Sequence, residues 1–250
     1  MKSIIITGIH GFVGSNLVRV LKDTFTIYGL DIVNPDKEGV VKTFSWDELD
    51  NCNIPEVDAI IHLAGKAHDT KNKSAADIYF KVNTGLTKKV FDYFSAHPSI
   101  SKFIFFSSVK AAVDKVPGDI LTEDVKPCPL GPYGESKVKA EEYIVSALKQ
   151  SPEKYVEKDV VILRPCMIHG PGNKGNLNLL YRVVCQGLPW PLGAFETRRT
   201  FTSIDNLTFV INGLLCKPIE SGIYNMADDE ALSTNELIRV MCQAMGLKSR

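Results

Sequence analysis

The chain begins with a buried strand that turns on glycine into a helix. Residues 4–14 read Ile-Ile-Ile-Thr-Gly-Ile-His-Gly-Phe-Val-Gly. Three successive isoleucines are typical of a strand buried on both faces, as in a parallel sheet. Gly8, Gly11 and Gly14 lead into an apolar helical pattern over residues 17–21. This order predicts a turn whose free backbone N–H groups, helped by the helix dipole, bind a pyrophosphate.

Three glycines alone are weak evidence, because a tight strand–helix turn can need them for packing. Their spacing also places two residues, not one, between the first pair. The second predicted strand, residues 25–31, ends in Asp31, seventeen residues after Gly14. A carboxylate there can accept both hydroxyls of an adenosine ribose and would repel a 2′-phosphate. The pair therefore predicts NAD rather than NADP, although Asp31 could instead start a turn before Asn34-Pro35.

Composition excludes several classes of protein. The 250 residues are 44% hydrophobic and carry 29 basic and 29 acidic side chains, so no global field attracts nucleic acid or acidic lipid. No apolar run approaches the roughly 18 residues of a membrane span, and the first residues form a core strand, not a signal peptide. Six scattered cysteines lack metal-ligand spacing. We expect a cytoplasmic protein with reduced thiols, no metal and no membrane or nucleic-acid partner.

Strand and helix patterns alternate along the first two thirds of the chain. Apolar runs at residues 57–65, 102–106 and 160–163 predict strands, and residues 75–94 and 133–148 predict helices. This alternation predicts an α/β, Rossmann-type doubly wound parallel sheet with helices on both faces. The carboxyl ends of the strands would then share one edge: Gly8, Asp31, Ala64, Ser107 and Arg164. The helix over residues 75–94 is expected to bury the stripe Ile78, Val82, Leu86, Val90 and Phe94.

The pattern changes near Gly170, where Gly, Pro, Asn and Trp interrupt shorter elements. We therefore expect a Rossmann domain over residues 1–169, to which later segments return, and a small C-terminal substrate-binding region over residues 170–250. An amphipathic helix over residues 234–245 is predicted close to the last residue.

The chemistry is predicted at the start of the helix over residues 133–148. Tyr133 and Lys137 are four residues apart and share a helix face. A phenol titrates near pH ~10 in water, and a fixed ammonium beside an oxidised nicotinamide would favour phenolate. Tyr133 could then take a proton from a substrate hydroxyl, with Ser108 hydrogen-bonding the reacting oxygen. The alternative for Ser107 and Ser108 is a helix N-cap or strand-end turn.

With these residues in place, the chain resembles the extended short-chain dehydrogenase/reductase family, and within it the nucleotide-sugar epimerases and reductases. The resemblance runs from Met1 almost to the last residue. One departure is His169, which stands where the family usually has tyrosine. The motifs that carry the resemblance are the glycine turn, Asp31, His62-Leu63-Ala64-Gly65, Val82-Asn83-Thr84-Gly85, Ser107-Ser108, the Tyr133/Lys137 pair, Arg164-Pro165 and His169-Gly170-Pro171-Gly172.

The resemblance implies roles for individual residues. Asn83 would brace the site. In the alternative interpretation, Asn83 is a helix-interior amide that hydrogen-bonds within its own helix. Residues 187–194 and Arg198-Arg199-Thr200-Phe201 resemble UDP-sugar 4-epimerases and 4-ketoreductases of polysaccharide pathways, in which Asn176 and Arg199 would bind the nucleotide diphosphate; a solvated arginine pair is the alternative. Ser108 and Tyr133 would contact the sugar. The expected NAD-binding residues are Gly8, Gly11, Phe12, Val13, Gly14, Asp31, Leu63, Ala64, Gly65, Lys66, Asn83, Ser107, Tyr133, Lys137, Pro165, Cys166 and Met167.

Three reactions share such a site. A 4,6-dehydratase is disfavoured, because Val109 and Lys110 stand where those relatives carry acidic side chains. We expect an NAD-dependent 4-epimerase that acts on a nucleotide sugar through a 4-keto intermediate, with a 4-ketoreductase as the alternative and a non-catalytic dinucleotide sensor as a further one. The resemblance also implies a homodimer built on helices 75–94 and 133–148, and a chain that is incomplete after Arg250.

Overall fold

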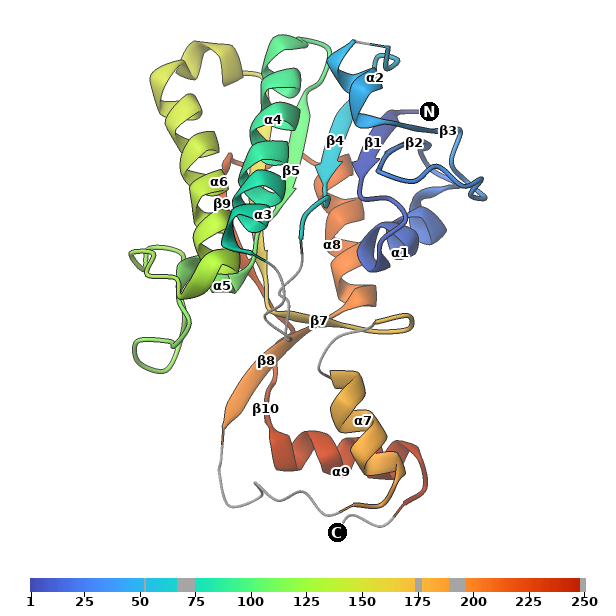
Figure 1. Ribbon diagram of the computed structural model, residues 1–250, viewed down its shortest axis with the longest axis vertical. Helices are drawn as coiled ribbons and strands as arrows, with labels where there is room; N and C mark the ends of the chain where they lie inside the picture. Colours follow the sequence, from blue (N-terminus) through green and yellow to red (C-terminus); the bar gives the residue numbers. More distant parts are fainter. Residues whose placement is uncertain (52, 67–74, 174–176, 189–196, 248–250) are drawn as a thin grey trace. The chain divides into compact units, whose positions relative to one another are not determined.

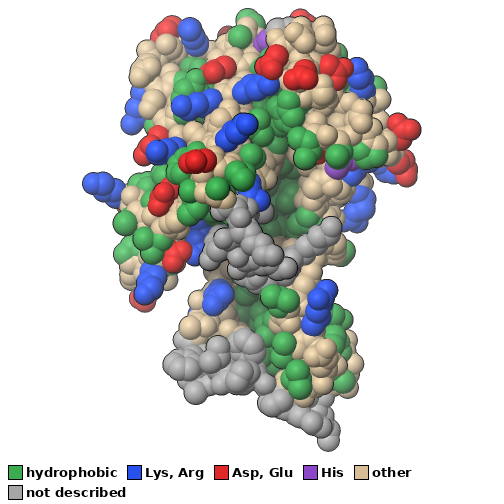
Figure 2. Space-filling model, viewed as in Figure 1, with side chains coloured by type: hydrophobic (Ala, Val, Ile, Leu, Met, Phe, Trp, Pro, Cys, Tyr) green, Lys and Arg blue, Asp and Glu red, His purple; other side chains and the backbone are tan. Residues whose placement is uncertain are grey.

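The computed structural model describes residues 1–51, 53–66, 75–173, 177–188 and 197–247. The chain folds into two compact units. The first unit contains Met1–Pro165 and Thr208–Asn225, and the second contains Cys166–Leu207 and Met226–Arg250. Figure 1 shows the elements of both units. On the face seen in Figure 2, basic and acidic side chains are interspersed over the first unit, in keeping with the balanced charge.

The first unit is built on a seven-stranded sheet of order β3-β2-β1-β4-β5-β6-β9. From β3 to β6 each neighbouring pair is parallel, which confirms the predicted Rossmann-type fold. The three isoleucines of β1 are all at most 1% exposed, because helices cover both faces of the sheet. The strands are β1 (Ser3–Thr7), β2 (Thr26–Leu30), β3 (Lys42–Phe44), β4 (Ala59–His62), β5 (Lys102–Phe106), β6 (Asp159–Pro165) and β9 (Gly222–Met226).

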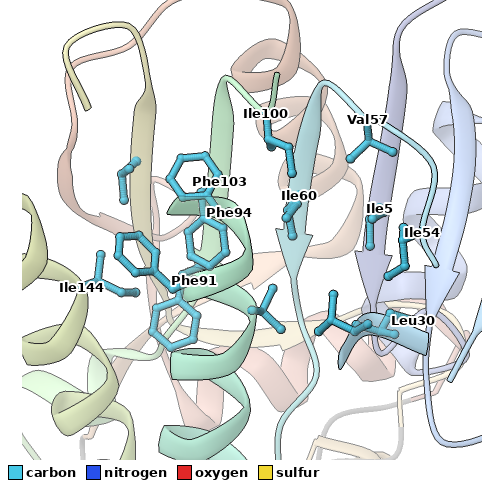
Figure 3. Packing of buried hydrophobic residues seen from close by; sticks show 14 of the residues in the cluster. Ile5, Leu30, Ile54, Val57, Ile60, Phe91, Phe94, Ile100, Phe103 and Ile144 are labelled. Atoms are coloured by element: carbon cyan, nitrogen blue, oxygen red, sulfur yellow. The ribbon is translucent and has the colours of Figure 1, made fainter. Parts of the chain in front are cut away.

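Two long helices, α4 and α6, pack on one face of this sheet (Figure 1). Figure 3 shows the core between them and the strands, where Phe91 and Phe94 of α4 meet Phe103 of β5, each pair 5.2 Å apart between ring centroids. The helical elements of this unit are α1 (Phe12–Leu21), α2 (Trp46–Asp50), α3 (Ala76–Tyr79), the π-helical turn η1 (Phe80–Gly85), α4 (Leu86–Ala96), α5 (Val109–Ala112), α6 (Gly131–Gln150), the 3-10 turn η2 (Pro152–Tyr155) and most of α8 (Ile204–Cys216).

The helix predicted over residues 75–94 is not one regular α-helix. The π-helical turn η1 separates α3 from α4, and the extra residue in a π turn rotates the buried face. Consequently Ile78, predicted to be buried, is 44% exposed, and Tyr79 is buried in its place. The predicted stripe holds only in α4, where Val90 and Phe94 are buried. Within η1 the buried side chains are polar, Asn83 and Thr84.

The second unit is a small α/β assembly. Its sheet has the order β10-β8-β7, with β7 (Met167–His169) parallel to β8 (Arg198–Ser203) and β10 (Ala231–Ser233) antiparallel to it. Helices α7 (Leu177–Cys185) and α9 (Thr234–Ala244) share a small apolar cluster. The helix predicted over residues 234–245 thus ends one residue earlier. No helix in the described parts of either unit is long and apolar enough to cross a membrane.

Candidate active site

The glycine turn between β1 and α1 needs glycine for its backbone. Gly8 has φ +68°, a left-handed conformation, and donates its N–H to the Leu30 carbonyl at 2.8 Å. A Cβ on Gly14 would lie 2.7 Å from the Gly8 carbonyl oxygen, so this glycine lets α1 pack on the turn. Ser15 donates the first backbone bond within α1, to Gly11. The N–H groups of Phe12 to Gly14 have no acceptor inside the helix and can receive an anion.

Asp31 lies immediately after β2, beside this turn. One carboxylate oxygen accepts the His10 N–H at 3.0 Å and the other accepts the Ile32 N–H at 2.7 Å. The first of these bonds ties the β2 end to the glycine turn. The side chain therefore has a fixed place at the strand edge and does not simply start a turn.

The loop after β4 is held by a buried network that the sequence did not reveal. Thr7 of β1 accepts the N–H groups of Leu63 and Ala64 at 3.1 and 2.9 Å. Its hydroxyl lies 2.7 Å from Nδ1 of His62, whose Nε2 lies 3.0 Å from the Thr87 hydroxyl. Thr87 donates its own proton to the Asn83 carbonyl, so Nε2 must donate and Nδ1 must accept.

His62 is therefore a neutral imidazole with a defined tautomer. Burial, with the Lys137 ammonium nearby, lowers its pKa to about 3. The ring stacks on Phe105 with centroids 5.6 Å apart. Its role is to fix the Leu63–Ala64 backbone, and the signal that could have revealed it is a histidine at the end of a buried strand.

Asn83, in the π-helical turn, is satisfied by residues far along the chain and not within its own helix. Its amide oxygen accepts the Lys66 N–H at 2.7 Å, and its amide nitrogen donates to the Lys66 carbonyl at 3.2 Å and the Ser136 hydroxyl at 2.9 Å. A Cβ on Gly65 would lie 2.9 Å from the same amide oxygen. Asn83 thus joins the loop after β4 to α6.

Tyr133 lies in the first turn of α6, and its phenol hydrogen-bonds the Ser108 side chain. Its ring meets that of Tyr79 edge-on, with centroids 6.4 Å apart. Burial raises the pKa of the phenol, while the Ser108 hydrogen bond acts in the opposite direction. The sequence predicted a lowered pKa for this phenol, but that lowering also requires the positive charge of an oxidised nicotinamide. The protein alone does not lower the pKa.

Lys137 lies one helical turn further along α6 and is 5% exposed. Its ammonium donates to the Phe106 carbonyl at 2.7 Å and lies 5.0 Å from the centre of the Phe105 ring. Burial lowers its pKa to about 8, and the carboxylate of Glu141 opposes that effect. A Cβ on Gly65 would lie 3.4 Å from Nζ, so the ammonium lies directly beside the loop after β4.

The two serines after β5 have different surroundings. Ser108 is the N-cap of α5, accepting the Lys110 N–H at 3.2 Å, and also meets Tyr133. Ser107 is buried and donates its hydroxyl to Glu141. The capping interpretation thus holds for Ser108, which also contacts Tyr133, whereas the Ser107 hydroxyl has a structural partner in Glu141.

The remaining predicted residues belong mainly to the second unit. Pro165 ends β6 in the first unit. Cys166 hydrogen-bonds the Thr200 hydroxyl at 3.1 Å, and burial raises the pKa of its thiol. Arg199 is exposed on β8, and Asn176 lies outside the described residues. Among the residues that the structure describes, no cluster of His, Cys, Asp or Glu could hold a metal ion.

Comparison with known proteins identifies the family. The model of the NAD dependent epimerase/dehydratase family matches residues 4–227. The chain belongs to this family. The epimerase/dehydratase chain is 31% identical to the UDP-glucose 4-epimerase of Vibrio cholerae over 260 residues, which cover 98% of this chain and 76% of that protein.

Solved structures of similar fold agree. This family member matches the UDP-N-acetylglucosamine 4-epimerase of Methanobrevibacter ruminantium with a TM-score of 0.82 and 21% identity, covering 99% of this chain and 83% of that one. It matches the UDP-glucose 4-epimerase of Thermus thermophilus, a complex with NAD, with a TM-score of 0.79 and 22% identity, covering 99% and 85%.

The first unit of this family member fits a dinucleotide. Gly8 and Gly14 allow the close turn at the N-terminus of α1, and a carboxylate fixed by the His10 N–H stands at the end of β2. Gly65, where a Cβ would meet Asn83, lets the loop after β4 lie close to Lys137. These are the features that a pyrophosphate, a ribose diol and a second ribose would require. The family is NAD-dependent, in agreement with the predicted preference.

Proposed function

We propose that this chain is an NAD-dependent 4-epimerase of a UDP-hexose or UDP-N-acetylhexosamine, acting through a 4-keto intermediate. The observation that carries the proposal is the grouping of Tyr133, Ser108 and Lys137 beside the glycine-lined loop after β4. It is supported by the relatives, several of which are named as UDP-sugar 4-epimerases.

In the proposed reaction Tyr133 accepts the proton of the C4 hydroxyl, and the C4 hydrogen leaves with its electron pair. When bound, NAD would supply the hydride acceptor and donor. Inversion at C4 requires the 4-keto sugar to turn over in the site before the hydride is returned. Ser108, already hydrogen-bonded to the phenol, is placed to share the reacting oxygen. The Lys137 ammonium stabilises the phenolate and holds the nicotinamide ribose. Tyr133 finally returns the proton to the new alkoxide.

The residues after Ser108 argue against dehydration. Val109 and Lys110 are the first residues of α5, and Lys110 forms an ion pair with Asp114. Removal of the C5 proton and protonation of the C6 hydroxyl need an acid–base pair here. A valine and an ion-paired lysine do not provide one, so the 4-keto sugar would return to the alcohol.

We propose that the first unit holds the cofactor through those of the predicted NAD-binding residues that it contains, Gly8 to Pro165, with Cys166 and Met167 added from the second unit. We propose that the second unit binds the nucleotide sugar. Arg199, exposed on β8, is available to pair with a diphosphate. We further propose a cytoplasmic homodimer that pairs helices α4 and α6. Sedimentation at micromolar concentration tests the dimer, and a monomer at that concentration would contradict it.

The test is turnover of purified protein with NAD and UDP-glucose, UDP-galactose or their N-acetylated counterparts, followed by chromatography of the products. We expect interconversion of the C4 epimers without net consumption of NAD, and its loss in Tyr133→Phe with NAD binding kept. Tyr143→Phe is the matched control, because Tyr143 lies on the same helix and bonds Asp92 at the surface.

Other outcomes select the alternatives. Stoichiometric oxidation of NADH by a 4-keto nucleotide sugar, without epimerisation, would identify a 4-ketoreductase. Equal inertness of the wild type and Tyr133→Phe, with both binding NAD, would identify a dinucleotide sensor and overturn the proposal.

A further inference from the structure

A buried carboxylate lies behind the Tyr133/Lys137 pair. Glu141 follows Lys137 by one helical turn on α6 and is 2% exposed. It accepts the Ser107 hydroxyl, the Arg164 Nε at 3.0 Å and the Arg164 Nη2 at 2.5 Å. Arg164 itself is 1% exposed, so this is a fork-shaped ion pair removed from water.

The carboxylate joins the three elements on which the site depends. Ser107 follows β5 and precedes Ser108, Arg164 lies near the end of β6, and Glu141 belongs to the helix that carries Tyr133 and Lys137. Glu141 therefore links the residue before Ser108 to the helix that carries Tyr133. A buried ion pair costs much desolvation and stabilises a fold little compared with apolar packing, so its presence here calls for another explanation.

One detail of the pair supports a role beyond packing. Arg164 Nη1 is buried and meets no acceptor among the residues that the structure describes. An apolar pair of similar shape would avoid this cost. Both oxygens of the Glu141 carboxylate accept hydrogen bonds, whereas one nitrogen of the Arg164 guanidinium has no acceptor among the described residues. The contacts therefore hold the carboxylate more completely than the guanidinium.

We propose that Glu141 is a positioning residue for the Tyr133/Lys137 pair: its buried carboxylate keeps the Lys137 ammonium charged and aligns Ser108 with Tyr133. The alignment of Ser108 with Tyr133 matters for catalysis only if the proposed function is correct. The effect of Glu141 on the charge of Lys137 does not depend on that function. Among the described residues, the titratable groups that interact with Lys137 include the neutral His62 on β4 and Glu141 on α6. One shell further out, Arg164 on β6 is ion-paired with Glu141, and Tyr133 on α6 meets Tyr79 of α3, over whose ring Lys66 lies.

The sign of the effect follows from these groups. Burial penalises the charged form of Lys137, and Glu141 is the anion that opposes this penalty. If Glu141 loses its charge, this opposing effect on Lys137 is lost and the burial penalty remains. The Lys137 pKa must then fall below its value of about 8.

The experiment is a direct titration of Lys137 by NMR of protein labelled at the lysine ε-carbon, with the signal assigned by Lys137→Arg. In Glu141→Gln we expect the titration midpoint to move down by about one pH unit, and the high-pH limb of the kcat profile to move with it. The matched control is Glu142→Gln, since Glu142 is the next residue and is exposed; it should leave both unchanged.

An unchanged Lys137 midpoint in a folded Glu141→Gln protein would overturn the inference. If that variant does not fold, Glu141→Gln/Arg164→Gln removes both charges and leaves neither unpaired, and it must show the same direction of change. The NMR titration needs no turnover, so a correct shift in a protein that epimerises nothing would reject the proposed function while keeping this inference.

Discussion

The phenol of Tyr133 hydrogen-bonds the side chain of Ser108, joining the first turn of α6 to the N-cap of α5. This bond depends on how closely the two helices approach. Gly134, the neighbour of Tyr133, packs so tightly that a Cβ there would lie 2.4 Å from the Lys110 carbonyl oxygen. The close approach of α5 and α6 beside Tyr133 therefore requires a residue without a side chain at position 134.

Gly134→Ala should separate α5 from α6 and weaken the Tyr133–Ser108 bond. Overpacking of this kind costs about 1–3 kcal/mol of unfolding free energy, and kcat should fall more than NAD affinity. Urea unfolding and steady-state kinetics check the two effects. Gly213→Ala is the control, since a Cβ there meets nothing within 4 Å and alanine favours the helix by about 0.5–1 kcal/mol.

Asp31→Asn should weaken NAD binding about tenfold or more, because a hydrogen bond from a ribose hydroxyl to a charged acceptor is worth about 1.5–3 kcal/mol. The loss of charge should also reduce discrimination against NADP. Calorimetric titration with both dinucleotides measures the ratio. Asp36→Asn, an exposed carboxylate on the same segment, should change neither affinity; equal losses in the two variants would exclude the ribose role.

Activity and stability should respond to alkaline pH in opposite directions. The Lys137 pKa is lowered to about 8 in the folded chain, below its unfolded value of about 10.4. Between these values the unfolded chain binds more protons, so the contribution of Lys137 to stability rises with pH by up to about 1.4 kcal/mol per pH unit. Over the same range kcat should fall as the ammonium is lost. The difference in unfolding free energy between wild type and Lys137→Met, measured from pH 7.5 to 10, should show this slope.

His62 should contribute to acid unfolding. Its folded pKa of about 3 lies below the unfolded value of about 6.5. Between the two the unfolded chain binds the extra proton, so this stability is present above pH about 6.5 and is lost as the pH falls. His62→Gln should be less stable at pH 7 but lose stability less steeply between pH 6 and 4 in urea titrations. His97→Gln, at the partly exposed end of α4, should keep the wild-type slope.

The sequence predicted the parts of the protein that depend on local pattern. Isoleucine runs and glycines at a strand end each predict one element, and the family match and the parallel sheet confirm the fold that they imply. The apolar stripe predicted over residues 75–94 holds only in α4. Asn83 was predicted to brace the site, but its partners Lys66 and Ser136 became visible only in the fold.

The contacts of Glu141 and His62 could not be predicted from the sequence, because they depend on how distant segments align in the fold. Glu141 and Glu142 are adjacent and chemically alike, yet only Glu141 is buried. Its four-residue spacing from Lys137 was the one available signal. The hydrogen bonds of His62 join three elements, β1, β4 and α4. No local sequence pattern predicts that this imidazole will hydrogen-bond Thr7 and Thr87.

The π-helical turn that contains Asn83 has a consequence for transplanting this site. A regular α-helix advances about 100° for each residue, so removing the one surplus residue would swing the amide away from its partners by that angle. Designers who copy the motif onto an ideal helical scaffold would lose these hydrogen bonds while keeping every side chain. The irregular turn must be copied with it.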